Sequence, residues 1–248
     1  MTSERPESRQ TAGFVDQSAR FVRTHLVDYP GAPAWILESE VLRGAGVSNV
    51  LDVGCGPGNF LAASVAEFGA ARGVGVEPSS DAVALLAEKF ADDPRLEFTT
   101  GQAHALPFET DSFDVVVCWS VLHWVGRNEY LQSLGELIRV TRRFLVIMDF
   151  VAGCDYRVPY SHDDRFFTYK MDFVPAVLAS GIMQCRDDRR WWELTDAGEP
   201  IPVSQDDLRA FDGNPISYAV RRGCIFEKDY DALPVRVASD FEAATVQE

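Results

Sequence analysis

A short apolar stretch that runs directly into three glycines constrains this chain more than any other feature of its sequence. The stretch reads NVLDVGCGPGNF, residues 49–60, and its glycines are Gly54, Gly56 and Gly58. Glycine adopts backbone conformations with positive φ and lets another molecule approach the main chain closely. A helix that begins behind such a loop presents bare N–H groups, which attract anionic and polar groups. We therefore expect a strand, a ligand-binding loop and a helix here.

Short apolar runs alternate with helical periods over the rest of the first 150 residues. We predict strands at 49–53, 72–77, 96–101, 112–120 and 143–150, and helices at 59–68, 80–90 and 128–140. The stretch 14–46 predicts two further helices, with a turn at Pro30–Pro33. Strands that alternate with helices indicate βαβ units and a parallel sheet covered on both faces. The chain is therefore expected to be an α/β protein.

The sequence changes character after residue 150, where aromatic and charged residues mix. It predicts a short helix at 174–180 and strands at 182–188 and 216–228. The stretch between these two strands has turn chemistry, and we interpret it as a functional excursion and not as a second domain. The first thirteen residues are polar and lack the apolar core of a signal peptide. We expect a disordered tail at 1–13 and a single domain at 14–248.

Charge and cysteine content narrow the classes of partner. The formal net charge is −15, which disfavours nucleic acid and anionic membrane surfaces because both bind mainly through lysine and arginine. No apolar run approaches the length of a membrane span. The cysteines are widely spaced and form no CxxC pair, so neither zinc nor a redox motif is indicated. We expect a reduced, cytoplasmic protein that acts on a small molecule, with its oligomeric state left open.

The glycine spacing bears on which ligand the loop holds. A dinucleotide fingerprint, GxGxxG, would place its third glycine at Asn59, whereas this loop reads GxGxG. Glu77 stands at the end of the second predicted strand, which lies beside the first loop in a doubly wound sheet. A carboxylate there accepts hydrogen bonds from both hydroxyls of a ribose. The sequence thus predicts a nucleoside ligand, with or without a pyrophosphate.

Three stretches, in order and at the usual spacing, resemble the class I S-adenosylmethionine-dependent methyltransferases. They read LDVGCGPGNF, GVGVEPS and GQAHALPFETDSFDVVVCWSVLHWV, within residues 49–150. The resemblance implies a Rossmann-like, doubly wound, seven-stranded sheet with its last strand antiparallel, N-terminal helices and an insertion between late strands. It also implies methyl transfer from S-adenosylmethionine to an O or N atom of a small metabolite, of natural-product or sugar-like type. Residues 14–46 would then be a helical cap, 49–150 the cofactor-binding core and 151–230 the substrate-facing elements.

The same resemblance assigns residues to the cofactor. The contacts that it implies are Asp52, Gly54, Cys55, Gly56, Glu77, Pro78, Gln102, Ala103 and Cys118. Asp52 would brace the loop near the methionine portion, Glu77 would bind the ribose hydroxyls, and Pro78 would pack on the adenine. Gln102 stands where the family commonly has aspartate, and its amide oxygen also accepts a hydrogen bond.

Catalytic and substrate residues follow less directly from the sequence. A hydroxyl acceptor benefits from a general base, and the candidates are His123, for which a structural role is the competing interpretation, and His162. Adjacent residues do not easily converge on one ion, so the run His162, Asp163, Asp164 does not predict a metal site. The aromatic substrate candidates are Tyr160, Phe167, Tyr169, Trp191 and Trp192. Acids interleaved among them, such as Asp163, Asp164, Asp187 and Asp188, would suit a polar or cationic small molecule.

Two other classes of function stay open at this point. One is a non-catalytic protein that keeps the cofactor fold and binds S-adenosylmethionine. The other is a nicotinamide-dependent oxidoreductase, which would need a glycine at position 59 and a Tyr-x-x-x-Lys pair that the sequence lacks.

Overall fold

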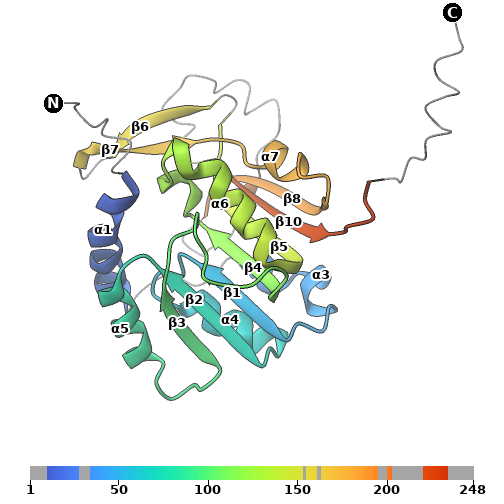
Figure 1. Cartoon of the computed structure of the whole chain (residues 1–248), viewed down its shortest axis with the longest axis horizontal. Coiled ribbons are helices and arrows are strands. Elements are labelled where there is room, and N and C mark those ends of the chain that lie inside the picture. Colours follow the sequence, from blue (N-terminus) through green and yellow to red (C-terminus); the bar gives the residue numbers. More distant parts are fainter. Residues whose placement is uncertain are drawn as a thin grey trace, which may run out of the picture.

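The structure is a computed structural model in which residues 10–27, 34–152, 155–160, 163–194, 200–202 and 220–233 are described. One mixed sheet organises them, with strand order β3-β2-β1-β4-β5-β10-β8-β9 (Figure 1). Its strands are β1 Asn49–Val53, β2 Arg72–Glu77, β3 Leu96–Thr100, β4 Phe113–Trp119, β5 Thr141–Phe150, β8 Met183–Leu194, β9 Pro200–Pro202 and β10 Arg221–Lys228. Strands β1 to β5 pair in parallel. Because β1 lies between β2 and β4, the order reverses there, and a doubly wound sheet binds ligands beyond the carboxyl ends of these strands.

The last described strand confirms the antiparallel end of the predicted sheet. Strand β10 inserts between β5 and β8 and pairs antiparallel with both. In the sheet order, the seven strands that run from β3 at one edge through β10 to β8 match the predicted seven-stranded sheet. The three-residue β9 adds an eighth strand at the other edge. The predicted strand 182–188 was too short, because β8 continues to Leu194.

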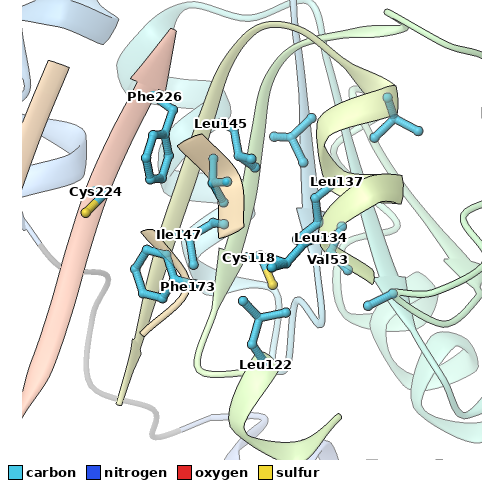
Figure 2. Close-up of a cluster of buried hydrophobic side chains, with 14 of the residues drawn as sticks. Val53, Cys118, Leu122, Leu134, Leu137, Leu145, Ile147, Phe173, Cys224 and Phe226 are labelled. Carbon is cyan, nitrogen blue, oxygen red and sulfur yellow. The ribbon is translucent and has the colours of Figure 1, made fainter. Parts of the chain in front are cut away.

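Helices cover both faces of the sheet. They are α1 Gln10–His25, α2 Ala34–Leu37, α3 Glu40–Arg43, α4 Asn59–Phe68, α5 Ser80–Lys89, α6 Arg127–Val140 and α7 Val174–Leu178. Helices α6 and α7 pack on one face, in a cluster that holds Leu137, Phe173 and Phe226 (Figure 2). Helices α2, α3 and α4 cover the other face around Phe60 and Trp191. No helix in the described ranges is both long enough and apolar enough to cross a membrane.

The elements nearest the amino terminus and after β5 differ most from expectation. Helix α1 begins at Gln10, inside the stretch predicted to be a disordered tail, and the turn predicted at Pro30–Pro33 lies outside the described residues. The sequence also gave no sign of the hairpin formed by β6 Tyr156–Tyr160 and β7 Asp163–Lys170. The hairpin and α1 lie together beyond one end of the main sheet (Figure 1). These two additions cover the edge at which a doubly wound sheet binds its ligand.

Candidate active site

The glycine loop after β1 has the conformation that its sequence requires. Gly54, Gly56 and Gly58 all have positive φ, at 73°, 52° and 78°. The Gly54 amide donates to the Val76 carbonyl at 2.8 Å, which fastens the loop to β2. A Cβ atom at Gly54 would lie 2.3 Å from the Val121 side chain. The loop is therefore bare because its backbone is left-handed and because the chain after β4 packs directly against it.

Glu77 at the end of β2 is aimed at this loop. Its Oε1 accepts a hydrogen bond from the Gly56 amide at 2.6 Å, and its Oε2 accepts one from the Ser18 hydroxyl of α1. The residue is only 5% exposed, and burial raises the pKa of its carboxyl above the ordinary value. A carboxylate so placed accepts hydroxyl hydrogen bonds, as the Ser18 contact demonstrates within the chain itself.

Asp52 on β1 is a second buried carboxyl beside Glu77. It is 2% exposed. Burial, and then the charge of Glu77, raise the pKa of Asp52 to about 8. Near neutral pH the two groups therefore hold less negative charge than two free carboxylates would.

A cavity of about 880 Å³ opens beside the glycine loop. This volume is at the upper end of the roughly 300–1,000 Å³ typical of small-molecule sites. The residues predicted from the sequence that line it are Asp52, Gly54, Cys55, Gly56, Glu77, Pro78, Gln102, Ala103 and Tyr160. Strand ends β1, β2 and β4, helix α1 and the β6–β7 hairpin all contribute to the wall. The structure thus brings together residues that lie far apart in the sequence.

Cys118 is the predicted cofactor residue whose side chain the structure places elsewhere. It is fully buried in the hydrophobic cluster under α6, near Leu122 and Leu134 (Figure 2). The next residue on β4, Trp119, lines the cavity instead. Successive side chains of a strand point to opposite faces of the sheet, so the predicted residue and the residue that faces the cavity differ by one position along β4.

Most of the predicted substrate aromatics lie away from the cavity. Trp191 packs edge-on against Trp35 at 6.0 Å between ring centroids, in the core below α2. Tyr169 is buried, and Phe167 lies under the guanidinium of Arg157 at 4.5 Å. The side chain of Trp192 is outside the described part of the chain. Among the members of this set whose side chains are described, Tyr160 alone lines the cavity.

Four aromatic residues that were not predicted from the sequence also line the cavity. They are Phe21, Phe60, Trp119 and Trp124. Trp119 and Trp124 follow the buried run of β4, which is where a doubly wound sheet binds its ligand. Their position at the end of this strand could have identified both tryptophans from the sequence. Nothing in the sequence indicated that Phe21, far upstream on α1, would join them.

His123 is held by a carboxylate in the protein interior. It lies in the short 3-10 turn η2, Leu122–Trp124, and is 6% exposed. Its Nδ1 lies 2.6 Å from Oδ1 of Asp149, whose Oδ2 accepts from the His123 amide at 3.2 Å. Burial lowers the pKa of His123 in spite of the opposing effect of Asp149. His123 does not line the cavity, so its assignment as a base stays a prediction. His162 lies outside the described residues.

Two of the acids expected to attract a cationic substrate, Asp187 and Asp188, form ion pairs with arginines. Asp187 pairs with Arg189 at 2.8 Å, and Asp188 pairs with Arg222 at 2.6 Å. Asp163 and Asp164 have side chains outside the described set. Within the described ranges, no group of three His, Cys, Asp or Glu side chains is arranged to hold a metal ion. Asp187 and Asp188 therefore give the expectation of a cationic substrate no support.

The cavity suits a nucleoside ligand on its own geometry. Glu77 Oε2 already accepts a hydroxyl hydrogen bond, the kind that a ribose would donate. Gly56 presents no side chain between that carboxylate and the loop, and Pro78, Gln102 and Ala103 line the cavity nearby. The donor set needs no metal to hold a ribose and an adenine.

Comparison with known proteins agrees with this geometry. Residues 50–143 match the family described as a methyltransferase domain. An uncharacterized methyltransferase of Schizosaccharomyces pombe is 30% identical over 126 residues, which cover 46% of this chain and 45% of that protein. The demethylmenaquinone methyltransferase of Lactococcus lactis is 33% identical over 99 residues, 38% of each chain. The chain thus spans less than half the length of these two relatives.

Solved structures resemble the chain over a greater length. A 1,6-didemethyltoxoflavin-N1-methyltransferase of Burkholderia thailandensis, with bound 1,6-didemethyltoxoflavin and S-adenosylhomocysteine, has a TM-score of 0.60 at 18% identity. The aligned region covers 90% of this chain and 88% of the Burkholderia chain. The [4+2]-cyclase SpnF has a TM-score of 0.62 at 17% identity, covering 89% of this chain and 96% of its own. At these identities the likeness shows the fold alone.

Proposed function

We propose that this chain is a class I S-adenosylmethionine-dependent methyltransferase that transfers a methyl group to an O or N atom of a small metabolite, and the match of residues 50–143 to a methyltransferase domain supports the proposal. The observation that carries the proposal is the placement of Glu77. Its carboxylate lies at the end of β2. One oxygen accepts a hydrogen bond from the Gly56 amide, and the other accepts one from the Ser18 hydroxyl. That is the arrangement a ribose requires beside a glycine loop.

The chain's own residues would divide the work of binding. Glu77 would hold the ribose hydroxyls, and Pro78, Gln102 and Ala103, which also line the cavity, would surround the adenine. Asp52 and the positive-φ glycines would lie along the methionine portion. Their bare backbone would let that portion pass close to the loop.

Little chemistry is then left for side chains. When bound, S-adenosylmethionine supplies a methyl carbon on a sulfonium that is already activated for displacement. The acceptor would take this methyl group, and the residues of this chain would hold the acceptor and the cofactor beside each other. The chain's part is to align the acceptor and to exclude water, for which α1 and the β6–β7 hairpin are placed over the cavity.

Calorimetry with S-adenosylmethionine, S-adenosylhomocysteine and NAD tests the proposal. We expect the two sulfur ligands to bind and to raise the melting temperature, since both bind the folded state. Glu77→Ala should weaken S-adenosylhomocysteine roughly 10- to 150-fold, because a hydrogen bond to a charged group is worth about 1.5–3 kcal/mol. Glu97→Ala, an exposed carboxylate on β3, is the matched control and should bind normally.

Two results would contradict the proposal. Binding of NAD without binding of either sulfur ligand would favour an oxidoreductase. Tight S-adenosylmethionine binding with no methyl transfer to any member of a broad metabolite panel would favour the non-catalytic alternative.

A further inference from the structure

Five aromatic side chains line the cavity and form an aromatic wall. The rings that form it are Phe21, Phe60, Trp119, Trp124 and Tyr160. Trp124 and Tyr160 meet edge to face with centroids 4.7 Å apart, and Phe60 and Trp119 do so at 5.8 Å. Edge-to-face pairs hold each ring in a defined orientation. The wall therefore presents flat, preset surfaces and suits a planar apolar molecule.

The polar side chains that line the cavity include the guanidinium of Arg20 and several hydroxyls. Arg20 comes from α1, and Ser120 follows the end of β4. Among the described residues that line the cavity, the only carboxylic acids are Asp52 and Glu77. Both belong to the cofactor end, where Glu77 is already bonded to Ser18 and Gly56.

Ser120 adds a directed hydrogen-bond donor. Its φ of 55° is unusual for a residue other than glycine, and such strain is found at functional sites. Its Oγ accepts from Nη1 of Arg221 at 3.3 Å. A hydroxyl has one hydrogen to donate, and an arginine cannot accept it, so that hydrogen is left for a further acceptor. Ser120 follows β4 beside Val121, which packs on the glycine loop.

We propose that the methyl acceptor is a planar aromatic molecule that carries an acidic group, a phenol or a carboxylate, and is neither a sugar nor an aliphatic amine. The aromatic wall would take the ring, and Arg20 and the Ser120 hydroxyl would take its oxygen atoms. An ammonium group would be attracted to the aromatic faces, but it accepts no hydrogen bond from the Ser120 hydroxyl and is repelled by Arg20. This inference rests on the proposed function and narrows its substrate class.

Binding of matched probes to the protein saturated with S-adenosylhomocysteine tests the inference. The probes are 3-hydroxy-2-naphthoate, 2-naphthylmethylamine and cyclohexanecarboxylate, followed by calorimetry and by quenching of tryptophan fluorescence. We expect the aromatic acid to bind at least about tenfold more tightly than either the amine or the non-aromatic acid. A tenfold change in affinity corresponds to about one well-placed hydrogen bond. Quenching should accompany binding because Trp119 and Trp124 are in the wall.

Substitutions separate the two components of recognition. Trp124→Leu should weaken the aromatic acid about tenfold or more, because it removes one flat surface. Arg20→Gln should reduce the preference for the acid over the amine. Arg23→Gln, on the same helix and exposed, is the control and should leave the preference unchanged.

The outcomes distinguish this inference from the proposed function. Preference for the amine, or no binding of the aromatic acid to protein that does bind S-adenosylhomocysteine, overturns the inference alone. Failure to bind S-adenosylhomocysteine overturns the proposed function, and with it the inference.

Discussion

Ser18 on α1 donates its hydroxyl hydrogen bond to Oε2 of Glu77, a residue 59 positions further along the chain. The helix that carries the cavity-lining residues Arg20 and Phe21 is thereby fastened to the carboxylate that we assign to the ribose. A ribose hydroxyl and Ser18 would use the same oxygen atom. Nucleoside binding and the position of α1 are therefore coupled through one hydrogen bond.

Removing this hydroxyl should strengthen nucleoside binding. We predict that Ser18→Ala tightens S-adenosylhomocysteine up to about tenfold, because the ribose no longer displaces an internal donor from Glu77. Calorimetry on the purified variant measures the change. Ser18→Thr keeps a hydroxyl and should behave like the unmodified protein. A loss of affinity in Ser18→Ala would mean that Ser18 assists the ribose and does not compete with it.

The stability of the ligand-free protein should fall as the pH rises, because of Asp52. Burial raises the pKa of this carboxyl from 3.8 in the unfolded chain to about 8 in the folded protein. Between these values the folded state binds more protons than the unfolded state, so the free energy of unfolding decreases with increasing pH. Asp52→Asn does not titrate, and its melting temperature should decline less between about pH 5 and about pH 9. Parallel curves for the two proteins would contradict the assignment.

A side chain at Gly54 should be more damaging than one at another glycine of similar backbone. Gly54→Ala combines positive φ with a Cβ 2.3 Å from Val121, whose branched side chain is stiff. Gly69 also has positive φ, at 65°, but a Cβ there meets nothing within 4 Å. We expect Gly69→Ala to lose about 1–2 kcal/mol of unfolding free energy and Gly54→Ala to lose more.

Urea unfolding measures both losses, and Val121→Ala combined with Gly54→Ala should recover part of the difference. Equal losses for the two glycine variants would show that the contact with Val121 has no cost.

Removing the imidazole of His123 should affect folding more than binding. His123→Ala removes the imidazole hydrogen bond from the buried carboxylate of Asp149, and leaving such a group unsatisfied typically costs about 1–3 kcal/mol. We predict a loss of this size in denaturant unfolding, with S-adenosylhomocysteine affinity preserved per folded molecule. Adding Asp149→Ala should cost less than the sum of the two single losses, because the two groups interact directly. Unchanged stability with turnover lowered about 10²–10⁴-fold would instead identify His123 as a base.

Features of the fold that depend on local chemistry were predictable from the sequence. Helix α4 has the predicted bounds, because Gly58 and Gly69 at its two ends both take the left-handed conformation. Glu77 was found from its place at the end of a short strand after the glycine loop. In both cases residues close in sequence determine the outcome.

Features that depend on pairing between distant segments were not predictable. Strand β4 is buried on both faces, so its sequence has no alternation to show that Trp119, and not Cys118, faces the cavity. The β6–β7 hairpin mixes charged and aromatic residues and includes Pro159, which weakens any strand pattern. Ser18 contacts Glu77 only because α1 packs beside α5, and no spacing in the sequence encodes that contact.

The place of β10 between β5 and β8 has a consequence for how the chain is made. Synthesis proceeds from the amino terminus, so the strand that joins β8 to the rest of the sheet is the last of the described strands to leave the ribosome. Until residues 221–228 emerge, one edge of β5 lacks its partner, and β8 has no place in the sheet. Unpaired strand edges are sites of aggregation in nascent chains. The growing polypeptide therefore depends on β10, or on a chaperone, to protect the edge of β5.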